Sequence, residues 1–102
     1  MSIEFRATFE PPLPPALQSR LLAEVGSNPS WSVIDQAEST IRLRSASREL
    51  RLEWPEDISV SVNADNLDLR FDSATRQERG EFLAFLQKVF ASLGVTADIE
   101  EL

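Results

Sequence analysis

Histidine, cysteine and tyrosine are all absent from this chain of 102 residues, and Lys88 is its single lysine. The absence of cysteine excludes disulfides, thiolate nucleophiles and thiolate metal ligands. The absence of histidine removes the side chain that most often transfers protons near neutral pH. Only carboxylates and Lys88 remain for acid–base chemistry, so the composition favours a non-enzymatic role.

Glycine and long apolar runs are also scarce. The three glycines, Gly26, Gly80 and Gly94, lie too far apart to form a phosphate-binding loop. The longest apolar run covers residues 82–86, which is far too short to cross a bilayer. The first ten residues carry charges and lack the uninterrupted apolar stretch of a signal peptide. We therefore expect a soluble protein of the cytoplasm.

Acidic residues outnumber basic ones, and the formal net charge is -7. Binding to nucleic acid requires a basic surface that contacts phosphates, so we expect no nucleic-acid partner. Binding to anionic membranes is disfavoured for the same reason. An acidic surface suits a basic protein partner, because complementary charges steer the encounter and select the partner. The alternative is that the charge serves only solubility.

Alternation of apolar and polar residues predicts most of the fold. It occurs over residues 3–9, 41–44, 50–54, 58–62 and 67–71, and a period of two is typical of strands with one buried face. Residues 31–37 and 95–101 are expected to form two further strands. The segments 41–44 and 50–54, with a turn between them, predict a hairpin.

Two segments have the apolar spacing of helices. The first follows a proline-rich stretch at 11–15, begins at Pro14 or Pro15, and is expected to end with Gly26 as its C′ residue. A polyproline ligand is the alternative role of those prolines. The second is expected between a capping box of Thr75 and Glu78 and a stop at Gly94. Its apolar stripe contains Phe82, Phe85, Leu86, Val89, Phe90 and Leu93.

The resulting order is β-α-β-β-β-β-β-α-β in a single domain covering residues 1–102. Alternating strands predict a sheet with one covered face and one wet face. Two amphipathic helices are enough to cover one face. We therefore predict a two-layer α+β sandwich, with a mostly antiparallel sheet and two helices on one face.

Charged residues are distributed unevenly along the chain. Arginines outnumber acids over residues 39–54, whereas acids outnumber arginines over residues 55–75. The wet face is therefore expected to carry arginines beside acidic loops, and arginine is enriched at protein interfaces. The alternative is a solvated surface of mixed sign. The candidate partner-binding residues are Arg42, Arg44, Glu49, Arg51, Glu53, Asp65, Asp68 and Arg70.

The acidic residues do not have the arrangement of a catalytic or metal site. Glu49 and Glu53 share a strand face with arginines, which lower a carboxylate pKa, whereas a general acid needs a raised one. Asp65, Asp68 and Asp72 miss the spacing of a calcium-binding loop. We expect Asp65 to form a turn and Asp68 to face solvent. No catalytic residue, metal or cofactor is predicted.

These observations favour a non-enzymatic, acidic protein-binding module that docks a basic partner. Small acidic bacterial proteins that neutralise a toxin, such as immunity proteins and antitoxins, have this size and charge, and an inhibitor that mimics nucleic-acid charge is a close variant. The alternative is a small regulatory or ligand-binding domain acting as a homodimer, with a cavity between helices and sheet or an exposed sheet paired across a two-fold axis. An enzyme would require a carboxylate of raised pKa in a cleft.

Overall fold

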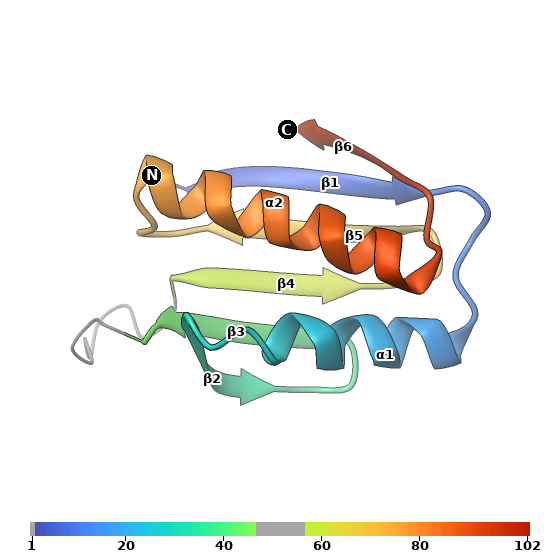
Figure 1. The fold of residues 1–102 in the computed structure, drawn as a ribbon, viewed down its shortest axis with the longest axis horizontal. Coiled ribbons are helices and arrows are strands. Elements are labelled where there is room, and N and C mark those ends of the chain that lie inside the picture. Colours follow the sequence, from blue (N-terminus) through green and yellow to red (C-terminus); the bar gives the residue numbers. More distant parts are fainter. Residues whose placement is uncertain (1, 47–56) are drawn as a thin grey trace.

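The computed structural model describes residues 2–46 and 57–102, and in these ranges the chain forms six strands and two helices. Figure 1 shows both helices on the same face of the sheet. The elements are β1 (Ile3–Phe9), α1 (Pro15–Gly26), β2 (Trp31–Gln36), β3 (Thr40–Ser45), β4 (Ile58–Val62), β5 (Asn66–Phe71), α2 (Arg76–Leu93) and β6 (Ala97–Glu101).

The strands lie in the order β2-β3-β4-β5-β1-β6, and each neighbouring pair is antiparallel. The predicted α+β sandwich with two helices on one face is confirmed. The strand expected at residues 50–54 lies outside the described residues, and so does its half of the predicted hairpin. Within the described residues, β3 has β2 and β4 as its neighbours.

The helix-covered face of the sheet holds the hydrophobic core. Phe82 of α2 is fully buried, and its ring meets Trp31 at 5.8 Å and Phe71 at 6.0 Å, edge to face in both contacts. Burial of one Phe or Leu side chain stabilises a fold by roughly 1.5–3 kcal/mol. The phenylalanine stripe of α2 is therefore a core feature. The core strands contribute Ile41, Leu43, Ile58, Val60, Val62, Leu67, Leu69 and Phe71, and the helices contribute Leu21, Leu22, Val25, Phe82, Leu86, Val89 and Phe90.

The ends of α2 follow the sequence prediction. The Thr75 hydroxyl accepts a hydrogen bond from the Glu78 backbone N–H at 3.2 Å, and the Glu78 carboxylate accepts one from the Thr75 N–H at 2.9 Å. Each bond satisfies a backbone donor that the first helical turn leaves free. Gly94 ends the helix in the left-handed region, with φ of 69°. The start of α1 is also as predicted, since Pro14 is its N-cap and Pro15 its first residue.

The predicted role of Gly26 as a C′ residue is wrong. Gly26 is the last residue of α1, and Ser27 caps the helix with a right-handed φ of -86°. A Cβ atom on Gly26 would lie 2.9 Å from Cδ1 of Ile41 and 3.4 Å from Cγ2 of Val33. Position 26 therefore requires a residue without a Cβ atom, because the end of α1 packs directly against β2 and β3. The spacing of apolar residues in the sequence does not reveal this contact.

Two glycine-to-alanine substitutions should have opposite effects on stability. Gly80→Ala lies in α2 with no atom near its added Cβ, so it should raise the free energy of unfolding by about 1 kcal/mol. Gly26→Ala should lower it, because fully buried Ile41 must shift. Chemical denaturation of both variants checks this. A Gly26→Ala variant as stable as Gly80→Ala would show that the helix–sheet approach is not tight.

A buried acid, Asp57, joins three parts of the fold. One carboxylate oxygen accepts the Ser45 backbone N–H at 2.8 Å, and the other accepts the Ser73 hydroxyl at 2.5 Å. The Asp57 backbone N–H donates to Leu43, and its carbonyl accepts from Asp72, both at 2.8 Å. The residue thus ties the end of β3 and the start of β4 to the segment that leads into α2.

Removal of this carboxylate should destabilise the protein. Asp57→Ala removes the acceptor of the Ser45 N–H and of the Ser73 hydroxyl. Because an unsatisfied buried group costs about 1–3 kcal/mol, we expect the free energy of unfolding to fall by about 2–3 kcal/mol. Ser73→Ala removes the bond from the Ser73 hydroxyl and leaves that from the Ser45 N–H, and should lower the free energy of unfolding by about 1 kcal/mol. Urea unfolding of the two variants gives the comparison. Equal losses would mean that the bond to the Ser45 N–H contributes nothing.

Candidate functional site: the open face of the sheet

The sheet face turned away from the helices, here called the open face, is almost entirely polar. Strand pairing and alternation set which side chains it presents. Its charged and hydroxyl side chains are Glu4, Arg6 and Thr8 of β1, Ser32 and Asp35 of β2, Thr40, Arg42 and Arg44 of β3, Ser59 and Ser61 of β4, Asp68 and Arg70 of β5, and Asp98 and Glu100 of β6.

Arg6 lies among carboxylates on this face. Its Nε donates to Oδ1 of Asp68 at 2.7 Å, across the directly paired residues of β1 and β5. The hydrogen bond and the charge of Asp68 raise the pKa of Arg6, and the charges of Glu100 and Glu4 add to the shift. Arg6 is absent from the residues predicted to bind a partner, because Asp68 lies 62 residues away in the chain.

Arg42 makes a second cross-strand ion pair at the opposite side of the open face. Its Nη2 donates to Oδ2 of Asp35 at 2.5 Å, linking β3 to β2. The hydrogen bond from Arg42, followed by the charge of Arg42, lowers the pKa of Asp35. This is the effect that the sequence analysis expected for Glu49 and Glu53, which lie outside the described residues.

The lowered pKa gives a pH-dependence of defined sign. The pair stabilises the fold above the pKa that Asp35 has in the unfolded chain, and the contribution is lost as pH falls through the lower folded pKa. We expect an NMR titration of the Asp35 carboxyl to show a midpoint below the usual aspartate range. Arg42→Gln should move the midpoint upward. An unchanged midpoint in that variant would contradict the ion pair.

Charge on the open face is segregated across the sheet. The half formed by β5, β1 and β6 holds Glu4, Asp68, Asp98 and Glu100 together with only two arginines, Arg6 and Arg70. The other half holds Arg42 and Arg44 on β3, with Asp35 beside them. The short side chains of Ser59 and Ser61 on β4 separate the two halves.

A hollow of about 330 Å³ lies on the open face where these serines meet β5 and β1. Serine is short, whereas the lining on β5 and β1 includes the longer side chains of Arg70, Arg6 and Glu4. The Ser59 hydroxyl is buried there, and no hydrogen-bond partner for it is present among the described residues. The hollow lies on the face opposite to the one where the ligand-binding alternative expected a cavity. Its lining consists of Glu4, Phe5, Arg6, Ser59, Ser61, Asp68, Leu69, Arg70 and Leu102.

The structure places the predicted partner-binding residues in three groups. Arg42, Arg44, Asp68 and Arg70 share the open face, and Asp68 faces outward as expected. Asp65 lies apart, in the exposed turn between β4 and β5. Three residues lie outside the described part of the chain: Glu49, Arg51 and Glu53.

The side chain that shapes the turn between β4 and β5 is Asn63, not Asp65. Oδ1 of Asn63 accepts the Asp65 backbone N–H at 2.8 Å and the Asn66 backbone N–H at 2.9 Å. This is an Asx turn, in which a side chain replaces a backbone acceptor. Asparagine at the start of a polar run after a strand is a signal that could have identified the turn former.

Comparison with known proteins returns no relative for this chain: no family model, curated protein or solved structure matches it. Within residues 2–46 and 57–102, no three acidic side chains gather closely enough to hold a metal ion. In the same ranges, neither helix is long and apolar enough to span a membrane.

Proposed function

We propose that this chain is a non-enzymatic, acidic protein-binding module that docks a basic partner protein through the open face. The segregation of charge across that face is the observation that carries the proposal. A complementary partner would set basic side chains over β5, β1 and β6, and an acidic side chain near Arg42 and Arg44. Such complementarity accelerates association and selects against wrong partners.

The hollow gives the open face a shape as well as a charge pattern. Its volume of about 330 Å³ is large enough to receive a long side chain, and the buried Ser59 hydroxyl offers a polar contact at its floor. Its lining includes two acids, Glu4 and Asp68, and two arginines, Arg6 and Arg70, so a polar side chain of the partner that entered it would meet groups of both signs. Anchoring side chains of this kind supply much of the free energy at protein interfaces.

An inhibitor of the immunity or antitoxin type is the form of this function that the chain favours. Its support is the small, acidic scaffold, whose stability resides on the other face of the sheet. Ion pairs at half-exposed positions such as Arg6–Asp68 add little to folding. The charges of the open face can therefore be matched to a particular partner without loss of the core.

A pair of serine-to-lysine substitutions tests the proposal. Ser61→Lys places a bulky cation in the hollow, whereas Ser19→Lys makes the same change at an exposed position of α1, on the other side of the molecule. Wild type and both variants are used as bait in native lysate at low salt, and the captured proteins are quantified. We expect a basic protein that wild type and Ser19→Lys retain and Ser61→Lys loses.

The affinity for the purified partner then gives the magnitude. We expect Ser61→Lys to weaken binding at least about tenfold, because it adds repulsion and fills the hollow, while Ser19→Lys leaves the affinity unchanged. Equal capture by all three baits would contradict docking on the open face. A concentration-dependent dimer that Ser61→Lys dissociates would instead support the homodimer alternative.

A further inference from the structure

The free edge of β6 is the part of the molecule that the open-face proposal leaves unused. β6 pairs with β1 in continuous register from Phe5–Glu101 to Phe9–Ala97. No strand of the described residues pairs with its other edge. At the opposite side of the sheet, β2 is interrupted by a register shift between Val33 and Asp35, and a bulge of that kind obstructs strand addition. β6 is thus the regular edge.

The pairing register shows which backbone groups of β6 face outward. The N–H of Leu102 donates to the carbonyl of Glu4, and the carbonyl of Thr96 accepts from Glu10, so the even-numbered residues turn their backbone groups toward β1. Hydrogen-bonding direction alternates along an antiparallel strand. The N–H and C=O groups of Ala97, Ile99 and Glu101 therefore point away from the sheet, ready for another strand.

An apolar groove lies beside this edge, on the helix side of the sheet. Its walls are the half-buried side chains of Phe5 on β1, Leu83 on α2, and Ala97 and Ile99 on β6, which pack against the core. Leu83 precedes Phe90 by two helical turns on the same face of α2, and the Phe90 ring contacts Phe9 of β1 at 5.9 Å.

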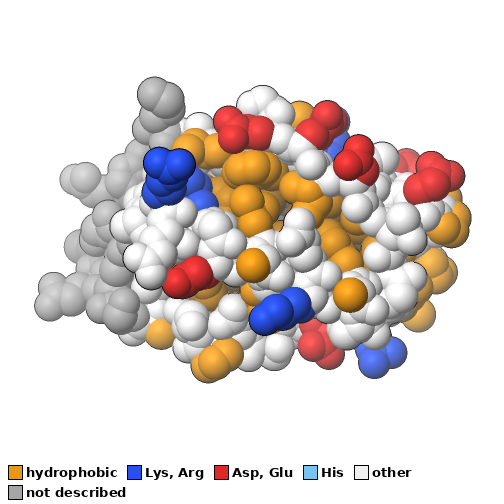
Figure 2. Space-filling model, turned by 45° about the horizontal axis from the view of Figure 1, so that its top comes forward, with side chains coloured by type: hydrophobic (Ala, Val, Ile, Leu, Met, Phe, Trp, Pro, Cys, Tyr) orange, Lys and Arg blue, Asp and Glu red, His pale blue; other side chains and the backbone are white. Residues whose placement is uncertain are grey.

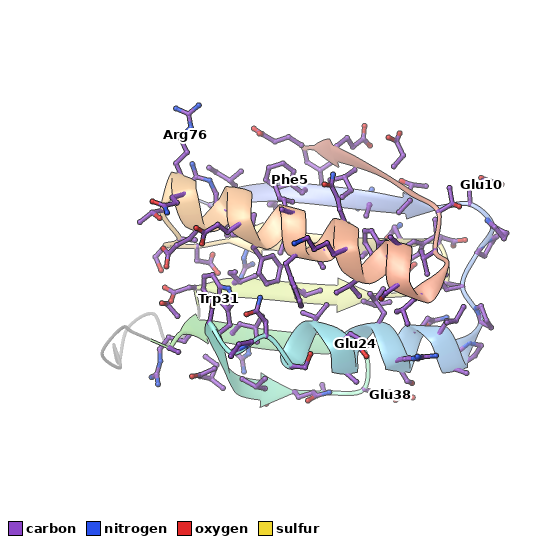
Figure 3. The ribbon with its side chains drawn as sticks, viewed as in Figure 1. Phe5, Glu10, Glu24, Trp31, Glu38 and Arg76 are labelled. Carbon is purple, nitrogen blue, oxygen red and sulfur yellow. The ribbon has the colours of Figure 1, made fainter. Side chains whose placement is uncertain are left out.

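The figures show the same arrangement from two directions. Figure 2, in which the top of the molecule is turned forward, shows hydrophobic side chains gathered between α2 and β6, with carboxylates along the upper margin. Figure 3 shows Phe5 beside α2 and Arg76 at the N-terminal end of that helix. The groove is thus bordered by acid along β6 and by a cation at one end.

The charge of β6 decides what can occupy the edge. Asp98 and Glu100 point to the open face, and Glu101 points to the helix side. Two copies of β6 placed antiparallel about Ile99 would set Asp98 of each beside Glu100 of the other, and like charges directly opposite one another are destabilising. A strand with lysine or arginine opposite Asp98 and Glu100 would instead form favourable cross-strand pairs.

We propose that β6 is a β-augmentation site for an extended basic segment of another protein, in which apolar residues alternate with lysine or arginine. The backbone of the segment pairs with Ala97, Ile99 and Glu101, its apolar side chains enter the groove, and its cations meet Asp98 and Glu100. This inference rests on the proposed function in that the partner is a basic protein that meets the open-face acids of β6, and it adds backbone pairing along the outer edge of that strand.

A synthetic peptide, acetyl-Lys-Val-Arg-Ile-Lys-Val-Arg-amide, serves as the probe on the full chain. Hydrogen exchange followed by NMR should show the amides of Ala97, Ile99 and Glu101 slowed at least about tenfold by the peptide, because they gain acceptors. A peptide with the same residues in grouped order, and one with glutamate in place of each cation, should have no such effect. These controls separate strand addition from general attraction to an acidic protein.

Paired charge variants isolate the contribution of β6. The double substitution Asp98→Asn and Glu100→Gln should weaken peptide binding about tenfold. The matched control, Glu24→Gln with Glu38→Gln, removes the same charge at positions that Figure 3 shows near α1 and away from β6, and it should leave the affinity within about twofold. Ala97→Pro, which removes an outward N–H without breaking a bond to β1, should abolish binding.

Each outcome decides the inference. Protection at β6 with selective loss in the Asp98/Glu100 variant supports it. The inference is overturned if the peptide does not bind at millimolar concentration, or if both charge variants lose the same affinity for it. It is also overturned if the peptide changes only NMR signals of the open face. Self-association that protects the β6 amides also overturns it, because the occupant would then be a second copy.

The native partner separates this inference from the proposed function. Loss of that partner in Ser61→Lys but not in Ala97→Pro leaves open-face docking standing and removes the edge. Loss in Ala97→Pro but not in Ser61→Lys keeps the edge and removes open-face docking, because Ala97→Pro leaves the charges of the open face unchanged.

Discussion

The whole architecture depends on one constraint: the described helices, α1 and α2, cover a single face of the sheet (Figure 1). Every core strand must therefore alternate, with one set of side chains dry and the other wet. The dry set includes Ile41, Val60 and Leu69, each at most 2% exposed. The wet set is free to carry charge at little cost to stability, which is why the open face differs so much from the core.

The same constraint explains the edges of the sheet. α2 packs Phe82 on Phe71 of β5 and Phe90 on Phe9 of β1, and β6 beside β1 keeps a half-buried apolar flank and an outward-facing backbone edge. Carboxylates on β6 protect that edge from self-pairing, because like charges repel across strands. Protection of this kind is selective: it repels another copy of the chain and attracts a strand of opposite charge. The hydrophobic core and the surface charge thus lie on opposite faces of the same strands.

Local patterns predicted much of the fold because their causes are local. Alternation identified β1, β3, β4 and β5, and the capping box of Thr75 and Glu78 depends only on residues three apart. The size of Gly26 could not be interpreted correctly in this way, since the reason is the approach of Ile41 from another element. The role of Asp57 was invisible for the same reason: its partners, Ser45 and Ser73, lie on either side of it at distances that no local pattern connects.

The amino-acid sequence by itself determined the fold class, the placement of Arg42, Arg44, Asp68 and Arg70 on the strand face away from the core, and the exclusion of histidine and cysteine chemistry. These follow from residue type and period, which need no knowledge of strand order. Only the tertiary structure decided that β1 lies between β5 and β6, which brings Arg6 to Asp68 and makes β6 an edge. Strand order depends on contacts between residues far apart in the sequence, and the short-range periodicity of a segment does not indicate which other segment it pairs with.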